Sequence, residues 1–240
     1  MEGLVYLVLG CKTSGRRQSV YDLISDVAKE EDPFTVLVST GETPNDWTDK
    51  IRDTASVTIE LYEDGVDDIA SDQLNPHHIN LILTPGNADP VDQVEALKPL
   101  LEPSGCHIGR IITIVDCDLL KAHNKLETWY DACIHFSDAC IIHRSPEMPN
   151  QFVQDFIDRY KDKQYPCLFE TVSKGRIKNP GLILEPQARR ISLYFEPEED
   201  LWLDSDDEEW EEPQEDPYMV RLPSGKREKW LHDVQSILRD

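Results

Sequence analysis

The sequence lacks any long hydrophobic run, and this absence excludes a helical membrane protein. Among its 240 residues, no apolar stretch approaches the roughly 18 residues that a membrane-spanning helix needs. The chain opens on the apolar run "GLVYLVLG", without the basic leader and small-residue cleavage site of a secretory signal. We therefore expect a soluble, cytoplasmic protein that does not associate with membranes.

Basic residues are scarce as well. The chain has 47 acidic and 24 basic residues, a net charge of −23 and a pI near 4.5. Such a charge repels nucleic acid and anionic lipid surfaces, so we expect no nucleic-acid partner. The charge is uneven, because residues 196–240 carry 16 acidic and 5 basic residues. The C-terminal part is thus electrostatically distinct from the rest.

The cysteines and histidines lack the spacing of metal sites. Six cysteines are scattered without a CxxC pair, several of them within apolar runs, which favours buried thiols over a disulfide framework. The adjacent His77 and His78 suggest either a metal site or, more simply, a polar loop before a strand. Because no nucleophile elbow is present either, we assign no metal ligand and no catalytic residue.

The apolar runs that are present alternate with segments of helical periodicity. Buried strands are predicted at "LVYLVLG", "FTVLVST", "INLILT", "RIITIVD" and "ACIIH", and helices at residues 20–28, 90–101 and 150–163. Asp89 and Pro90 suit the N-cap and first position of the second helix. This alternation predicts a three-layer α/β domain with a mostly parallel sheet, which we place at residues 1–172.

Three further segments follow this domain. Residues 173–195 form a connecting region in which "RRISLYF" (189–195) predicts one more strand. Residues 196–216 are acidic at 13 of 21 positions, which is typical of a disordered or extended segment. Residues 217–240 predict a C-terminal helix with Trp230, Leu231, Val234, Ile237 and Leu238 along one face. That helix would either dock on the α/β domain or serve a partner.

The turn after the first strand has the frame of a phosphate-binding loop. Gly10 and Gly15 stand five apart between an apolar run and a helix, but Arg16 and Arg17 replace the Lys and the Ser or Thr of that motif. Arginine is longer and forked, and Arg17 offers no hydroxyl to magnesium. A shifted register would use Lys12 and Thr13 instead, with Cys11 in place of a glycine. Alternatively, Arg16 and Arg17 pair with neighbouring acids.

Three later stretches give this loop a context. "ILTPGNADPVDQVEAL" (82–97) resembles the segment after the third strand of CobW-type GTPases, a family related to UreG and HypB, which reads Glu-Thr-Ser-Gly and ends in Ala-Asp-Pro. Thr84, Gly86, Ala88, Asp89 and Pro90 match that pattern. "GRIITIVDCD" (109–118) is similar to the family's strand ending in Val-Asp, with Asp116 at the acid, and "SDACIIHRSP" (137–146) is similar to its Ala-Asp strand before the guanine-reading Asn-Lys-x-Asp.

The resemblance implies a P-loop NTPase-like fold over about residues 3–170, and it also shows what is missing. Leu83 stands at the Walker-type glutamate, and His143-Arg144-Ser145-Pro146 replaces the base-reading tetrapeptide. The strand resembling the one before the family's Cys-x-Cys-Cys motif, "SVTIELYEDG" (56–65), has no cysteines after it. Phosphoryl transfer without a metal or a positioned cation loses most of its electrostatic stabilisation.

We therefore expect a degenerate CobW-like P-loop protein, a pseudo-GTPase with an acidic C-terminal extension that acts through protein contacts. The alternative is a nucleotide-binding GTPase or metallochaperone with an atypical phosphate loop. The candidate site comprises two groups: phosphate-loop residues Gly10, Lys12, Thr13, Gly15, Arg16 and Arg17, and switch-region residues Thr84, Gly86, Asp89 and Asp116.

No cofactor is expected under the first interpretation, whereas the alternative needs GTP or another phosphate ligand; Mg²⁺ is not expected. The partner is expected to be a protein, basic if residues 196–216 bind it. Four large apolar residues stand among the acids and favour such a binding segment, namely Leu201, Trp202, Leu203 and Trp210. The alternative is a solvated tail that keeps the chain soluble.

Overall fold

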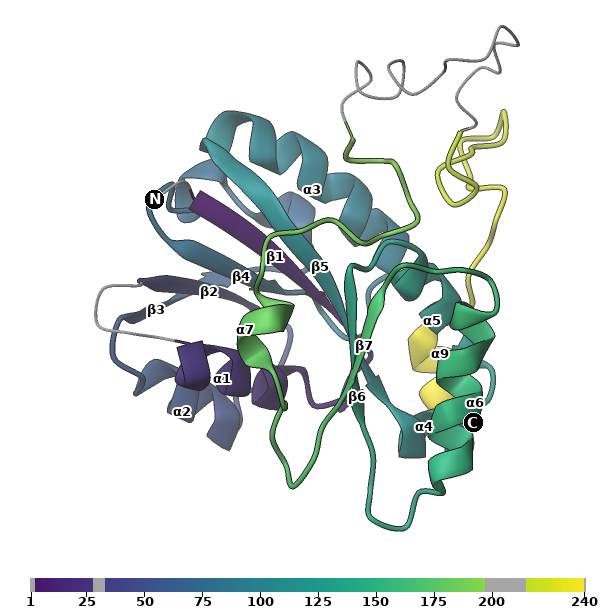
Figure 1. The fold of residues 1–240 in the computed structure, drawn as a ribbon. Helices are drawn as coiled ribbons and strands as arrows, with labels where there is room; N and C mark the ends of the chain where they lie inside the picture. The colour runs from purple at the N-terminus through teal and green to yellow at the C-terminus, as the bar shows by residue number, and fades with distance from the viewer. Residues whose placement is uncertain (1–2, 28–32, 197–214, 240) are drawn as a thin grey trace, which may run out of the picture.

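A single seven-stranded parallel sheet forms the centre of the molecule. The computed structural model describes residues 3–27, 33–196 and 215–239. The strands lie in the order β3-β2-β4-β1-β5-β6-β7, and every neighbouring pair is parallel (Figure 1). Their bounds are β1 Gly3–Leu9, β2 Phe34–Ser39, β3 Val57–Tyr62, β4 Ile79–Leu83, β5 Cys106–Asp116, β6 Ala139–His143 and β7 Leu168–Thr171. The predicted parallel sheet is confirmed.

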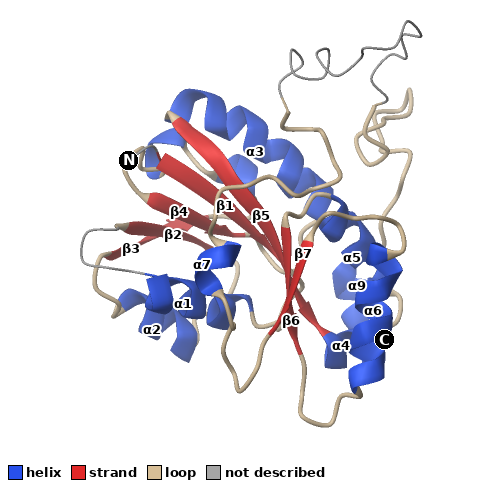
Figure 2. Cartoon of the chain, in the orientation of Figure 1, coloured by secondary structure: helices blue, strands red, loops and turns tan. Residues whose placement is uncertain are grey.

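Helices cover both faces of this sheet, as Figure 2 shows, and each face has its own hydrophobic cluster. One layer consists of α1 (Arg16–Val27), α2 (Asp46–Arg52) and α7 (Pro180–Ile183). The other consists of α3 (Pro90–Ser104), α4 (Cys117–Ala122), α5 (Leu126–His135), α6 (Asn150–Lys161) and α9 (Val234–Arg239), with the 3-10 turns η1 (Val66–Asp68) and η2 (Ser71–Gln73) beside α3. The three-layer α/β architecture is therefore confirmed.

Helix α3 begins where its local chemistry directs it, whereas the helix predicted at residues 20–28 begins earlier, at Arg16. Asp89 accepts a hydrogen bond from Val91 N (2.8 Å) as the N-cap of α3, Pro90 takes the first helical position, and Gly105 ends the helix at φ +68°. In α1 the predicted stripe is buried at Val20, Leu23 and Ile24. Burial of such stripes, more than propensity, stabilises helices of this length.

The strand predicted at "RRISLYF" is wrong. Residues 189–195 form turns and irregular backbone, because the backbone N–H groups of Arg189 and Arg190 donate to the fully buried carboxylate of Asp138 at 2.6 and 3.1 Å. The guanidinium of Arg190 pairs with the same carboxylate at 3.2 Å. A sheet ladder would engage these two N–H groups elsewhere and leave the buried carboxylate with fewer donors.

The C-terminal helix is much shorter than the prediction, because it begins only at Val234. Residues 217–233 form turns, with a bridge between Arg221 and Arg227. We call residues 215–239 the C-terminal arm. Of the predicted apolar stripe, Val234 and Ile237 are buried against the α5 side, whereas Trp230 is 71% exposed. The arm therefore docks on the α/β domain through part of the expected face.

The connecting region and the arm are both tied to the domain by polar contacts. Arg110, fully buried on β5, donates to the carbonyl oxygens of Leu182 (2.7 Å), Ile183 (3.2 Å) and Gln187 (3.0 Å). Asp216 accepts from His135 Nε2 at 2.8 Å and from Ser192 Oγ at 2.5 Å. Residues 173–196 and the arm thus fold as parts of the domain.

Three further predictions concern the acidic segment, the cysteines and membrane-spanning helices. The acidic segment 196–216 lies mostly outside the described residues, which include only Glu196, Glu215 and Asp216 of it. All six cysteines are buried with free thiols. Within the described ranges, no helix is long and apolar enough to cross a membrane.

Replacing the buried guanidinium of Arg110 should loosen the connecting region. Arg110→Leu removes three hydrogen bonds and leaves the buried Ile183 carbonyl oxygen unpaired, so we expect the free energy of unfolding to fall by about 3 kcal/mol. Urea unfolding measures this change, and limited proteolysis should cut within residues 180–190. The control is Arg52→Leu, whose exposed pair with Asp49 should change stability by about 0.5 kcal/mol or less. Equal effects of the two substitutions would contradict this interpretation.

The Asp216 contact predicts a pH dependence of arm docking. Burial alone would raise the pKa of Asp216, but hydrogen bonds from His135, Ser192 and Tyr218 N hold it below its ordinary value. A depressed folded-state pKa contributes stability above the unfolded-state pKa of about 3.9, which is lost as the pH falls through the folded-state pKa.

Asp216→Asn should therefore lower the free energy of unfolding by about 1–2 kcal/mol at pH 7, and the difference from wild type should shrink below about pH 4. Urea unfolding at pH 7, 5 and 3 measures both effects. Glu215→Gln, at an exposed neighbour, is the control and should match wild type throughout. A wild-type-like Asp216→Asn at pH 7 would rule out this contact as a stabilising anchor.

Candidate functional site

The loop between β1 and α1 has the tight backbone of a phosphate-binding turn. Gly10 (φ +151°) and Gly15 (φ +88°) adopt conformations that favour glycine. A Cβ on Gly10 would lie 2.8 Å from the Ile114 carbonyl oxygen, and one on Gly15 would lie 3.0 Å from the His143 ring. Both glycines are therefore required by packing, whether or not a phosphate binds.

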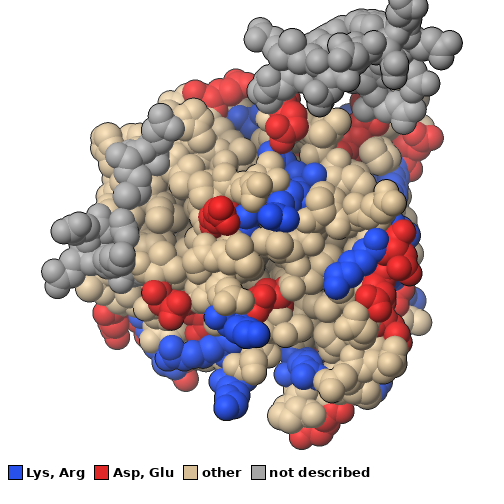
Figure 3. Space-filling model, in the orientation of Figure 1, with Lys and Arg blue, Asp and Glu red and all other residues tan. Residues whose placement is uncertain are grey.

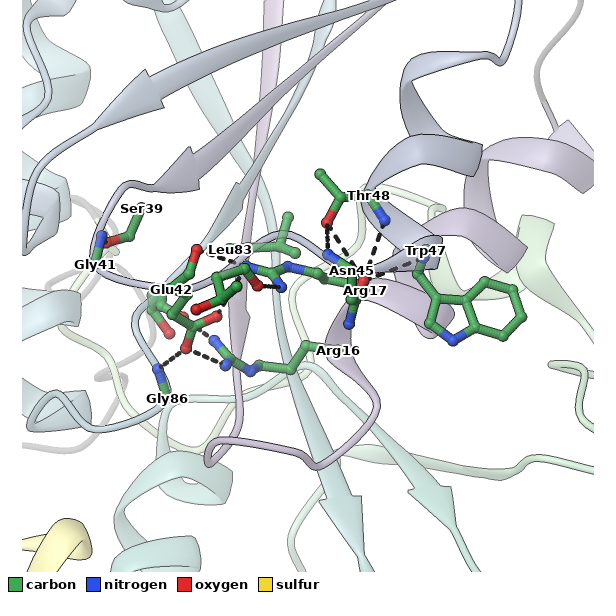
Figure 4. A network of polar contacts seen from close by, with 12 residues as sticks. Arg16, Arg17, Ser39, Gly41, Glu42, Asn45, Trp47, Thr48, Leu83 and Gly86 are labelled. Carbon is green, nitrogen blue, oxygen red and sulfur yellow. Dashed lines mark hydrogen bonds and ion pairs between the residues drawn. The ribbon is translucent and has the colours of Figure 1, made fainter.

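Arg16, which the sequence resemblance aligns with a phosphate-binding lysine, contacts protein groups. Its side chain is 6% exposed. Nη1 donates to the Thr84 carbonyl oxygen, and Nη2 pairs with Glu42 Oε1 at 2.5 Å (Figure 4). Arg16 therefore pairs with an acidic residue, Glu42, as the alternative interpretation of this loop expects.

Arg17 extends the same network. Its Nη1 donates to the Thr43 carbonyl oxygen at 2.6 Å, and its Nη2 lies 3.4 Å from Glu42 Oε2. Glu42 also accepts a hydrogen bond from Gly86 N at 2.8 Å. One carboxylate therefore joins the start of α1 to the loops that follow β2 and β4 (Figure 4).

Glu42 is the functional-site residue that sequence reasoning missed. Burial raises its pKa, but Arg16, the Gly86 N–H and Arg17 together hold the pKa below its ordinary value, so it is ionised. The loop around it is fixed at both ends, since Ser39 Oγ accepts from Gly41 N (3.1 Å) and Asn45 caps α2. The only sequence signal was a polar loop at the carboxyl end of a buried strand.

Lys12 and Thr13 have exposed side chains. Their backbone is fixed, since Lys12 N donates to Gly86 O at 2.9 Å and Thr13 takes a φ of +71°. Together with Gly15, Arg17 and Glu42 they line a pocket of about 420 Å³ that extends to Asn45 and Trp47. The shifted register therefore brings a cation and a hydroxyl to this pocket.

The predicted switch-region residues are brought to the same edge of the sheet, but each has a structural contact. A Cβ on Gly86 would lie 2.3 Å from Lys12 N, so only glycine fits against the loop. Thr84 Oγ1 donates to the Val8 carbonyl oxygen at 3.1 Å. Asp89 and Asp116 are the N-caps of α3 and α4. Of these four, Thr84 and Gly86 contact the phosphate loop.

Residues at the base-reading and Walker-type positions have contacts within the domain, as His143, Ser145 and Leu83 show. His143 Nε2 lies 2.7 Å from Ser19 Oγ, and burial lowers the pKa of this imidazole, which favours its neutral form. The following turn is held by Asp118, which accepts from both Ser145 N and Ser145 Oγ at 2.6 Å. Leu83 is 3% exposed and belongs to the hydrophobic cluster on the α1 face.

Metal binding has no candidate cluster in the part of the chain that the structure describes, where no three His, Cys, Asp or Glu side chains gather suitably. His78 Nδ1 contacts Thr35 Oγ1 at 2.9 Å, as the polar-loop interpretation of the histidine pair expects.

Comparison with known proteins bears on the fold. No family model matches the sequence, and no curated protein matches it. Among solved structures, the signal recognition particle receptor FtsY from Elizabethkingia anophelis, in complex with GDP, matches with a TM-score of 0.51 and 13% identity. The match covers 73% of this chain and 59% of FtsY.

Two further structures are similar at lower TM-scores. A Zn(II)-bound triple mutant of YjiA, a GTPase from E. coli, has a TM-score of 0.49 and 12% identity over 77% of this chain. HypB from Helicobacter pylori, in complex with nickel, has a TM-score of 0.46 and 13% identity over 75% of this chain and 81% of its own. The chain spans about 61% of the YjiA chain. At such identities the comparison concerns architecture, and the match to FtsY shows that this chain has an α/β fold of the P-loop NTPase-like type.

Proposed function

We propose that this chain is a degenerate, CobW-like P-loop protein without GTPase activity, which acts through protein contacts. The observation that carries this proposal is the state of Arg16. In a working loop, the cation at this position reaches the β- and γ-phosphates. Here it is 6% exposed and already neutralised by Glu42. A phosphate would have to compete with a buried, charge-assisted pair.

The other altered positions support the same proposal. Arg17 binds the Thr43 carbonyl oxygen where a hydroxyl would hold Mg²⁺. Leu83 is packed in the core, and Pro146 replaces the base-reading carboxylate. Since phosphoryl transfer depends on metal and cation electrostatics, such a site gives little stabilisation to the transition state.

The proposed partner is a protein with a basic surface that binds the acidic segment 196–216. The described ends of that segment are attached to the domain, by the Arg190–Glu196 pair (2.9 Å) and by the contacts of Asp216. The segment therefore starts and ends at a fixed place on the molecule. Multiple acidic groups attract a basic surface over roughly one Debye length, so binding should weaken with salt.

The alternative function is nucleotide binding through an atypical loop, with GTPase or metallochaperone activity. The exposed Lys12 and Thr13 beside the 420 Å³ pocket favour it. The local charge favours the alternative as well. Figure 3 shows Lys and Arg side chains on the face that carries α1 and α7. Lys174 and Arg176 are exposed in a turn whose Gly175 carbonyl oxygen accepts a hydrogen bond from Gln18 of α1. Anionic ligands are attracted to such a surface.

A nucleotide assay distinguishes the two functions. We expect wild-type protein to show no rise in melting temperature and no hydrolysis with GTP or ATP in the presence of Mg²⁺, because Arg16 is already paired. Differential scanning fluorimetry and phosphate release measure these quantities. Magnesium-dependent GTP binding in the micromolar range that Lys12→Ala and Thr13→Ala abolish would establish the alternative. The control is Lys161→Ala, at an exposed lysine in the last turn of α6.

Removal of the acidic segment tests the proposed partner surface. The ends can be joined by a short Gly-Ser linker in place of residues 198–213, because Asp216 contacts Ser192. We expect unchanged urea unfolding and loss of the proteins that wild type retains in a pull-down at about 50 mM salt but releases at about 500 mM. A second variant keeps the length and replaces the acids by Asn and Gln. An unchanged set of retained proteins would exclude this surface.

A further inference from the structure

Three separate segments of the chain meet at the Glu42 carboxylate. Arg16 comes from the start of α1, Glu42 from the loop after β2, and Gly86 from the loop after β4. The carboxylate accepts from Arg16 Nη2 (2.5 Å) and from Gly86 N (2.8 Å), and both charged side chains are largely buried, at 6% and 15% exposure (Figure 4). Arg16 Nη2 and Gly86 N therefore form a binding site for an anion, and the carboxylate of Glu42 occupies it.

The donors of this site are of the kind that hold a terminal phosphate. The cation of a P-loop reaches the β- and γ-phosphates, and in GTPases the γ-phosphate holds two mobile loops in one conformation. Here residues 40–45 and 84–89 are the loops that Glu42 joins to α1. A carboxylate has the same sign of charge and accepts from the same donors, but it is covalently part of the chain.

We propose that Glu42 is a built-in substitute for a terminal phosphate, which keeps both loops in one conformation without a nucleotide and which inorganic phosphate can replace when the carboxylate is removed. This inference deepens the proposed function and rests on it, since it explains how a nucleotide-free loop stays folded. The two loops then keep their binding surface in one conformation at all times, instead of changing it when a nucleotide binds.

The site has donor capacity that a carboxylate does not use. Arg17 Nε is buried without a hydrogen-bond partner, and Arg17 lines the same pocket as Glu42. A phosphate group offers more acceptor oxygens than a carboxylate does. The adjoining pocket of about 420 Å³, which Glu42 itself lines, gives a small anion access.

Chemical rescue of Glu42→Ala tests the proposal. The variant should melt at a lower temperature than wild type, because Arg16 loses its counter-charge. Inorganic phosphate or pyrophosphate at about 5 mM should raise the melting temperature of the variant by about 3 °C or more, relative to sodium chloride of equal ionic strength. Wild type should respond by less than about 1 °C, since its own carboxylate fills the site. Hydrogen exchange should be faster in residues 40–45 and 84–89 of the variant, and phosphate should slow it again.

Three controls make the result specific. Glu63→Ala removes an exposed carboxylate nearby and should neither melt early nor respond to phosphate. The double variant Arg16→Gln with Glu42→Ala lacks the cation and should not be rescued. If Glu42→Ala does not fold in plain buffer, it should regain the circular dichroism spectrum of wild type on refolding with about 5 mM phosphate but not with sodium chloride of equal ionic strength. Equal responses of wild type and variant would indicate general salting effects and would overturn the proposal, as would rescue of the double variant.

The two proposals fail in different ways. Magnesium-dependent GTP turnover by wild type would overturn the proposed function and this inference together. A silent wild type, combined with a Glu42→Ala variant that phosphate does not rescue, would leave the proposed function in place and overturn only the role of Glu42.

Discussion

The ion pair between Arg16 and Glu42 is the interaction on which the arrangement of the site depends. A guanidinium that is 6% exposed needs a counter-charge, because an unpaired buried cation is strongly destabilising. In a nucleotide-binding loop the phosphates would supply that charge, and here the chain supplies it. The forked guanidinium also donates to the Thr84 carbonyl oxygen, which lets one side chain join two loops. The arginine at this position therefore has a structural role.

The glycines near this ion pair are required by packing. Gly86 lies against the loop so closely that a Cβ would approach Lys12 N to 2.3 Å, and Gly15 lies against the His143 ring. These contacts exist without any ligand. A glycine pattern by itself thus indicates a tight turn between strand and helix, and only the side chains facing the site can indicate phosphate chemistry.

The sequence predicted the features that depend on local patterns. Apolar runs located the inner strands, and Asp89 with Pro90 located the start of α3. The predictions from the sequence failed where a polar contact between distant residues determines the backbone conformation. "RRISLYF" alternates like a strand, but Asp138 binds its N–H groups across 51 and 52 residues. Glu42 likewise meets Arg16 and Gly86 across 26 and 44 residues. No local periodicity encodes such a pairing.

The C-terminal arm and the Glu42 network contact adjoining parts of the chain, α3 and the loop that precedes it. Arg227 of the arm pairs with Asp92 and Glu95 in the first two turns of α3 at 2.6 and 2.5 Å, and Trp230–Val234 line a pocket with Asn87–Asp89, the residues just before α3. Glu42 holds the other end of that loop through Gly86 N. The arm and Glu42 therefore both hold residues 86–95, a continuous stretch that runs from the loop after β4 into α3.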